Sequence, residues 1–115
     1  MIVDDSKFMR RIIREALESG GHEIIQEAEN GYDALDMYKA NRADLVTMDI
    51  TMMGKDGLKT VEELVEFDPD AKIIVISAIN EQVLKSSRKV EIPAKGFLQK
   101  PFDKETILRL IDEIL

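Results

Sequence analysis

The sequence contains no cysteine, no excess of basic residues and no run approaching the roughly 20 apolar residues that span a bilayer. Without cysteine, neither a disulfide framework nor a thiolate metal site can form. Because the N-terminus also has no basic region followed by a long apolar one, we expect a cytoplasmic protein without membrane insertion. The 16 Lys and Arg against 23 Asp and Glu give a net charge of -7, which argues against direct nucleic-acid binding.

The order of apolar and polar segments indicates the fold class. A chain of 115 residues, 44% of them hydrophobic, can bury the core of one domain, 1–115, and leaves no space for a second. Strand-like runs alternate five times with segments of helical spacing, and no repeat or linker interrupts them. This alternation predicts an α/β fold with right-handed crossovers and a parallel sheet covered on both faces.

Local patterns give the expected elements. The expected strands are 1–3, 23–29, 44–48, 72–76 and 96–99, and the expected helices are 6–18, 32–40, one stopped at 68–70, one beginning near 81 and one capped by Asp103. The residues at core spacing in the first helix are Phe8, Met9, Ile12, Ile13, Ala16 and Leu17, and the residues on its opposite face are Arg10, Arg11, Arg14 and Glu15.

Polar residues follow four of the expected strands. Asp4 and Asp5 come after the first strand, Asp49 after the third, Ser77 after the fourth and Lys100 after the fifth. In an open parallel sheet these ends share one edge, where ligands bind at the topological switch point. Three carboxylates brought together there would repel each other unless a cation neutralised them. Oxygen ligands with no cysteine and no nearby histidine favour a hard ion such as Mg²⁺.

The same residues allow phosphoryl chemistry. The Asp49 carboxylate can attack a phosphoryl group and hold it as an acyl phosphate, while a metal ion and Lys100 stabilise the transferring oxygens and Ser77 donates a hydrogen bond. The alternative is structural: Asp4 and Asp5 cap a helix, Ser77 ends a strand and Lys100 is solvated. Their joint occurrence favours the functional interpretation.

The order of these residues resembles the receiver domain of two-component response regulators over essentially the whole chain. The matching segments are Val3-Asp4-Asp5, Asp44 to Met52, Gly57, Ser77-Ala78 and Lys95 to Phe102. Stand-alone, chemotaxis-type CheY proteins are the closest in shape. The resemblance implies a flavodoxin-like (βα)5 fold, a doubly wound parallel five-stranded sheet with strand order 2-1-3-4-5.

By match of position, the resemblance also implies a Mg²⁺-dependent phosphoryl switch. Asp49 would be the phospho-acceptor, Asp4 and Asp5 would arrange Mg²⁺, and the backbone carbonyl of Thr51 would complete the protein ligands. The protein would be a signalling switch and no enzyme beyond its own phosphorylation and dephosphorylation.

The resemblance assigns the other site residues to the switch itself. Ser77 would bond the phosphoryl group, Lys100 would pair with it, and the Lys100–Pro101 bond would be cis. Phe97 matches the switch aromatic, which would rotate inward when Ser77 moves and reshape the face of the fourth helix, last strand and last helix. The alternative for Phe97 is an ordinary core aromatic.

The implied partners are a histidine kinase as phosphodonor and a downstream target protein, for which a flagellar motor switch is one candidate. We expect a monomer, with a strand-exchanged dimer as the alternative, because three residues before Asp4 make a poor central strand. Met53 stands where the family usually has proline, and Val90 to Pro93 replaces an Ala-Gly turn, which predicts a short or irregular fourth helix.

Other functions remain open alternatives at this point. A phosphatase of the haloacid dehalogenase type also uses an aspartyl nucleophile, but it needs a second acid where Thr51 stands. A receiver that no longer switches would not need all five polar residues. The receiver fragment of a DNA-binding response regulator and a phosphorelay intermediate fit the same residues, because they would differ in partners or in the length of the parent protein.

Overall fold

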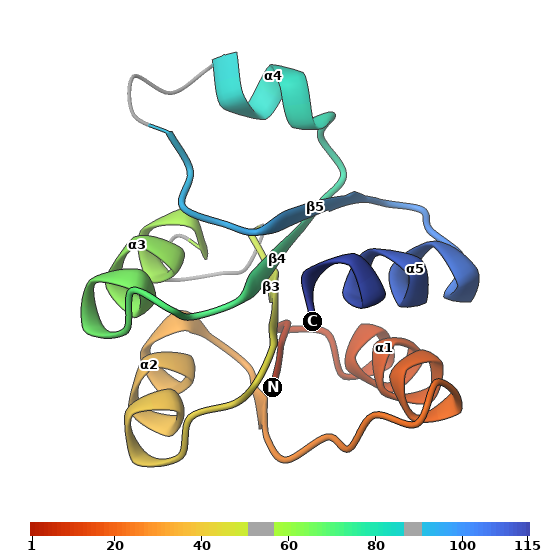
Figure 1. Cartoon of the computed structure of the whole chain (residues 1–115), viewed down its shortest axis with the longest axis horizontal. Coiled ribbons are helices and arrows are strands. Elements are labelled where there is room, and N and C mark those ends of the chain that lie inside the picture. The colour runs from red at the N-terminus through yellow and green to blue at the C-terminus, as the bar shows by residue number, and fades with distance from the viewer. Residues whose placement is uncertain (51–56, 87–90) are drawn as a thin grey trace.

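The computed structural model describes residues 1–50, 57–86 and 91–115. Within these ranges, five parallel strands form one sheet in the order β2-β1-β3-β4-β5, which confirms the predicted flavodoxin-like topology. The strands are β1 Ile2–Val3, β2 Glu27–Ala28, β3 Val46–Asp49, β4 Ile73–Ser77 and β5 Gly96–Gln99, and the helices are α1 Lys7–Ser19, α2 Gly31–Ala40, α3 Gly57–Phe67, α4 Glu81–Ser86 and α5 Lys104–Ile114. Helices α1 and α5 cover one face of the sheet, and α2 and α3 cover the other (Figure 1).

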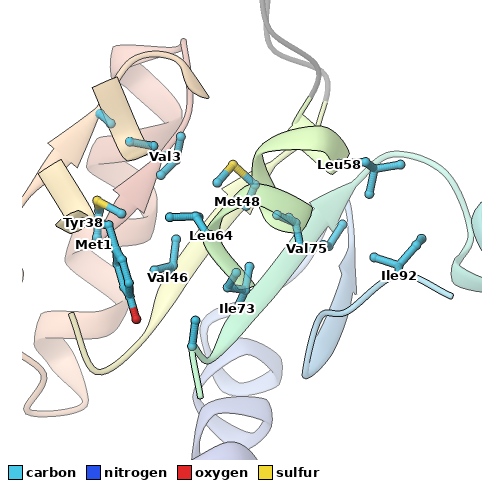
Figure 2. Close-up of a cluster of buried hydrophobic side chains, with 14 of the residues drawn as sticks. Met1, Val3, Tyr38, Val46, Met48, Leu58, Leu64, Ile73, Val75 and Ile92 are labelled. Atoms are coloured by element: carbon cyan, nitrogen blue, oxygen red, sulfur yellow. The ribbon is translucent and has the colours of Figure 1, made fainter. Parts of the chain in front are cut away.

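The core has two halves, one on each face of the sheet. Strands β3 and β4 are buried along their whole length, as expected of runs that are covered on both faces. Figure 2 shows the half under α2 and α3, whose members include Val3, Tyr38, Val46, Met48, Leu64, Ile73 and Val75. The half under α1 and α5 includes Ile2, Ile13, Leu17, Ile74, Ile76, Ile107 and Ile111.

Three helices begin at side chains that accept a hydrogen bond from the first turn. Ser6 Oγ accepts from the Met9 N–H of α1 at 3.2 Å. Asn30 does the same for α2. Asp103 Oδ1 accepts from the Thr106 N–H of α5 at 2.8 Å, so the predicted cap is confirmed. Each such cap satisfies a backbone donor that has no partner inside its helix.

The prediction for the first helix is confirmed for Ile13, Ala16 and Leu17, which are buried, and is wrong for Phe8, Ile12 and Arg10. Phe8 and Ile12 are 71% and 38% exposed, whereas Arg10 is only 8% exposed. Arg10 lies three and seven residues before Ile13 and Leu17, so it continues their buried stripe one turn towards the N-terminus. Its guanidinium group is tolerated there because it donates hydrogen bonds to the buried Asp4 carbonyl and to the partly buried Glu27 side chain. With Arg10 turned inward, Phe8 is turned to solvent.

The second strand is shorter than predicted, Glu27–Ala28 in place of 23–29. The reason is its neighbour: β1 pairs through two residues, Ile2 with Glu27 and Val3 with Ala28. The short first strand is therefore confirmed. Helix α4 spans six residues, and Val90 lies outside the described residues. No helix in the described ranges is both long and apolar enough to cross a bilayer.

Candidate functional site

Strand register brings three acids together at the carboxyl edge of the sheet. Val3 pairs with Met48, which places Asp4 beside Asp49 on the next strand. One carboxylate oxygen from each of Asp4, Asp5 and Asp49 lies within 4.8 Å of the other two. Asp4 and Asp49 are buried, at 1% and 2% exposure, and Asp5 is exposed. The result is a cluster of oxygen donors that solvent reaches on the Asp5 side.

The environment of Asp4 favours a cation. Burial, reinforced by the neighbouring Asp49 carboxylate, raises the pKa of Asp4 to about 6, although the Ser6 N–H donates to its Oδ1 at 2.9 Å. Its other oxygen, Oδ2, is buried and has no hydrogen-bond partner among the described residues. A buried acceptor without a donor is costly, and a bound cation would satisfy it. Three oxygen donors suit a hard ion.

Ser77 and Lys100 lie at the same edge, on the other side of Asp49. The Lys100 Nζ is 3.5 Å from Asp49 Oδ2. The Ser77 side chain is buried, and its Oγ accepts from the Ile79 N–H at 2.9 Å, which leaves the hydroxyl hydrogen to donate. The Lys100 N–H donates to the Ser77 carbonyl at 2.8 Å, and the Lys100–Pro101 bond is cis. The Lys100 ammonium thus lies beside the Asp49 carboxylate, and the Ser77 hydroxyl lies at the end of the neighbouring strand β4.

Gly57 lets the first turn of α3 lie against the chain at Asp49. A Cβ added to Gly57 would stand 2.5 Å from Ile50 Cα and 2.8 Å from the Asp49 carbonyl oxygen. Both neighbours are backbone atoms, which cannot swing away. Gly57 therefore fixes how closely α3 approaches the acidic cluster, and this is a physical reason for glycine at that position.

Phe97 lies between the core and α4. Its ring is partly buried against the α2–α3 half of the core, and Lys85 Nζ lies 4.8 Å from the ring centroid. A cavity of about 330 Å³ adjoins the ring and is also lined by Ser77 and Leu84. Ser77 and Phe97 therefore border the same space under α4.

The structure gathers most residues singled out from sequence, namely Asp4, Asp5, Asp49, Ser77 and Lys100, at one edge. Thr51 and Met53 lie outside the described residues. Sequence reasoning missed Arg10 and Glu27, which hold the backbone behind Asp4. The spacing of Arg10 to Ile13 and Leu17 could have revealed its inward position, whereas nothing in the sequence indicated Glu27 as its partner.

Fold and site together define a doubly wound α/β domain with an acidic ligand site and a lysine at the carboxyl edge of its sheet. Residues 1–112 match the response regulator receiver domain, and the chain belongs to that family. It is thus a receiver domain of two-component signalling.

Relatives of similar length support the same assignment. The chain is 43% identical over 115 residues to the chemotaxis protein CheY of Halobacterium salinarum, covering 100% of this chain and 94% of that protein. It is also 43% identical to protein CcdB of Bacillus subtilis, with 100% and 95% coverage. Among solved structures, a CheX–CheY complex with BeF3 and Mg²⁺ from Borrelia burgdorferi superposes with a TM-score of 0.88 at 37% identity, covering 98% of this chain and 85% of that chain.

Proposed function

We propose that this protein is a phospho-acceptor switch of chemotaxis-type signalling in the cytoplasm, phosphorylated on Asp49 by a histidine kinase. The observation that carries the proposal is the buried Asp49 carboxylate, with two further acids within 4.8 Å and the Lys100 ammonium at 3.5 Å. An acid placed between a cation site and a lysine is suited to receive a phosphoryl group, because both positive charges stabilise the transferring oxygens.

The proposed metal site consists of Asp4, Asp5 and Asp49, with the Thr51 backbone carbonyl as a further ligand. The oxygen-only donor set and the unpartnered Asp4 Oδ2 support Mg²⁺ as its occupant. Once bound, Mg²⁺ would neutralise the acids and offset the charge of the phosphoryl oxygens. The solved CheY complex from Borrelia burgdorferi contains Mg²⁺, which agrees with this choice.

In the proposed transfer, an Asp49 carboxylate oxygen attacks the phosphorus of a phosphohistidine on the kinase. The new bond joins oxygen to phosphorus, and the bond between phosphorus and the imidazole nitrogen breaks with its electron pair on the nitrogen. Ser77 donates its hydroxyl hydrogen to one phosphoryl oxygen, and Lys100 pairs with another. Hydrolysis of the acyl phosphate returns the carboxylate and inorganic phosphate, so the chain modifies only itself.

The proposed output runs from Ser77 to Phe97. A phosphoryl group on Asp49 adds charge and acceptor oxygens that draw Ser77 and Lys100 towards it. Because Ser77 and Phe97 line one cavity, movement of Ser77 changes the space open to the Phe97 ring. An inward ring would lose its contact with Lys85 of α4 and reshape the face formed by α4, β5 and α5.

The proposed partners are a histidine kinase and a target protein that docks on this face, with a flagellar motor switch as one candidate. The Halobacterium salinarum relative, which is named as a chemotaxis protein, supports the chemotaxis assignment. Because this relative is named as a chemotaxis protein and the match spans 94% of it, the comparison favours a chemotaxis-type switch over the receiver of a DNA-binding regulator or a phosphorelay intermediate.

The direct test is the intact mass of the protein after incubation with a small acyl phosphate, with and without Mg²⁺. We expect a single phosphoryl adduct that requires Mg²⁺ and is absent in Asp49→Asn. The matched control is Asp44→Asn, which removes an exposed acid just before the same strand and should be phosphorylated like wild type. Unchanged phosphate uptake by folded Asp49→Asn would refute the site assignment.

A further inference from the structure

Arg10 is a buried charged residue on α1 that reaches the backbone of the acidic cluster. Its side chain is 9% exposed. Nη1 donates to the Asp4 carbonyl oxygen at 2.7 Å, and Nε donates to Glu27 Oε1 at 3.1 Å. Nη2 lies 3.6 Å from Glu29 Oε1. The guanidinium group thus bridges the end of β1, at Asp4, and the short strand β2, at Glu27.

Hydrogen bonds hold every polar atom of Asp4 except one carboxylate oxygen. Its N–H donates to the Ala28 carbonyl at 3.1 Å, its carbonyl accepts from Arg10, and its Oδ1 accepts from the Ser6 N–H. Only Oδ2 has no partner among the described residues. Strand β1 ends one residue earlier, at Val3, so the Asp4 carbonyl lies beyond the hydrogen-bonded strand. Arg10 supplies the hydrogen-bond donor that a neighbouring strand would otherwise give.

Glu27 holds the Arg10 guanidinium group, which also contacts Asp4. One oxygen of Glu27 accepts from Arg10, and the other accepts from Arg14 Nε at 2.8 Å, with Arg14 Nη2 at 2.6 Å. Charge-assisted contacts of this kind are short and directional. Arg14 therefore shares the helix and the ion-pair partner of Arg10, but it contacts Glu18 and Glu27 and not Asp4 among the described residues, which makes it a matched control.

We infer that Arg10 is a positioning residue for the acidic cation site: it fixes the Asp4 backbone so that Asp4 Oδ2 is presented to the metal ion. This inference rests on the proposed function, because it concerns the same cation site. Groups that orient metal ligands from behind contribute roughly 10- to 100-fold to metal affinity. Without the guanidinium group, the buried Asp4 carbonyl would lose its donor, and rotation of the chain after Val3 would move the carboxylate.

The test is calorimetric titration of the full chain with Mg²⁺ for wild type, Arg10→Gln and Arg14→Gln. Both variants lose an ion pair with Glu27, so both should be less stable in urea. We expect Arg10→Gln alone to bind Mg²⁺ roughly tenfold or more weakly than wild type. In phosphorylation by a small acyl phosphate, Arg10→Gln should need more Mg²⁺ for its half-maximal rate, with the rate at saturating Mg²⁺ less affected. A purely structural role would lower stability without this shift.

The outcomes separate this inference from the proposed function. If wild type binds no Mg²⁺, the proposed cation site itself is wrong. If wild type binds Mg²⁺ and folded Arg10→Gln binds it as tightly as Arg14→Gln does, the positioning role is overturned. Should Arg10→Gln fail to fold, Arg10→Lys replaces it, because an ammonium group keeps the charge but cannot bridge both acceptors as a planar fork does. Weakened Mg²⁺ binding by Arg10→Lys supports the role, and wild-type affinity overturns it.

Discussion

Asp4 is a carboxyl group whose ionised form the fold disfavours. Burial and the neighbouring Asp49 carboxylate raise its pKa from 3.8 to about 6. Between pH 3.8 and about pH 6, Asp4 is more fully protonated in the folded state than in the unfolded chain. The stability contributed by this group is therefore fully present below its unfolded pKa and is lost as the pH rises through about 6. Without a divalent cation, we expect wild type to lose thermal stability from about pH 4 to about pH 6, relative to Asp4→Asn.

The comparison with Asp4→Asn is needed because a second group titrates in an overlapping range. Burial lowers the pKa of the Met1 ammonium group to about 6, so its contribution to stability has the opposite sign and falls as the pH is lowered. Met1 is common to both proteins and cancels in the difference between their melting temperatures. Parallel pH profiles for the two proteins would contradict the account of Asp4. Added Mg²⁺ should diminish the difference at about pH 7, because a bound cation favours the ionised carboxylate.

Among the structural elements, α3 begins in close contact with the chain that follows Asp49. Gly57→Ala would place a Cβ 2.5 Å from Ile50 Cα, so either α3 or the chain after Asp49 must move. We expect a loss of about 1–3 kcal/mol in the free energy of unfolding, the usual cost of overpacking, measured by urea denaturation. We also expect slower phosphorylation, because the Asp49 backbone would be displaced.

Gly20→Ala is the control for the Gly57 substitution. Its added Cβ would also lie 2.5 Å from a neighbour, but that neighbour is Leu108 Cδ2, the end of a flexible side chain. Rotation of the Leu108 side chain can relieve the clash, so we expect a clearly smaller loss of stability and no change in phosphorylation. Equal losses for the two variants would show that the close backbone approach of α3 is not the source of the effect.

The elements also show what the sequence can and cannot predict. Apolar runs that end in Asp49, Ser77 and Lys100 predicted one shared edge, because parallel strands deliver their carboxyl ends to the same side. The helical spacing of Arg10 to Ile13 and Leu17 allowed an inward position, but it could not show that the side chain is buried. A charged side chain is buried only where tertiary partners meet it, and the partner Glu27 lies 17 residues away in sequence. The length of β2 could not be predicted from the local sequence either, because β2 pairs only with the two residues of its neighbour β1.

Across the entire sheet, the strands differ in how many residues they pair through, and the ladders of β1 are the shortest. Strand β1 lies between β2 and β3 and pairs with each through two residues. The β3–β4 and β4–β5 ladders pair through four residues each. In this half of the sheet, the ladders of β1 are supplemented by α1, because Arg10 and Arg14 both contact Glu27 of β2.

This asymmetry predicts that the β1–β2 region opens before the rest of the sheet. The Asp4 amide, which donates to the Ala28 carbonyl, should exchange its hydrogen through a local opening. The Val46 amide, which donates to the Lys72 carbonyl between β3 and β4, should exchange only through global unfolding. Native-state hydrogen exchange measured by NMR in low urea distinguishes the two, because a local opening exposes less surface and has a smaller urea dependence.

One shared opening free energy for Asp4 and Val46, with one urea slope, would contradict this division and make the sheet a single cooperative unit. If the division holds, Arg10→Gln should lower the opening free energy measured at the Asp4 amide. The Val46 amide should still exchange only through global unfolding in this variant. An opened β1 and β2 present unpaired backbone groups that a second chain can pair with. We therefore expect a strand-exchanged dimer to form at a lower protein concentration in Arg10→Gln than in wild type. Light scattering after size-exclusion chromatography measures the dimer fraction.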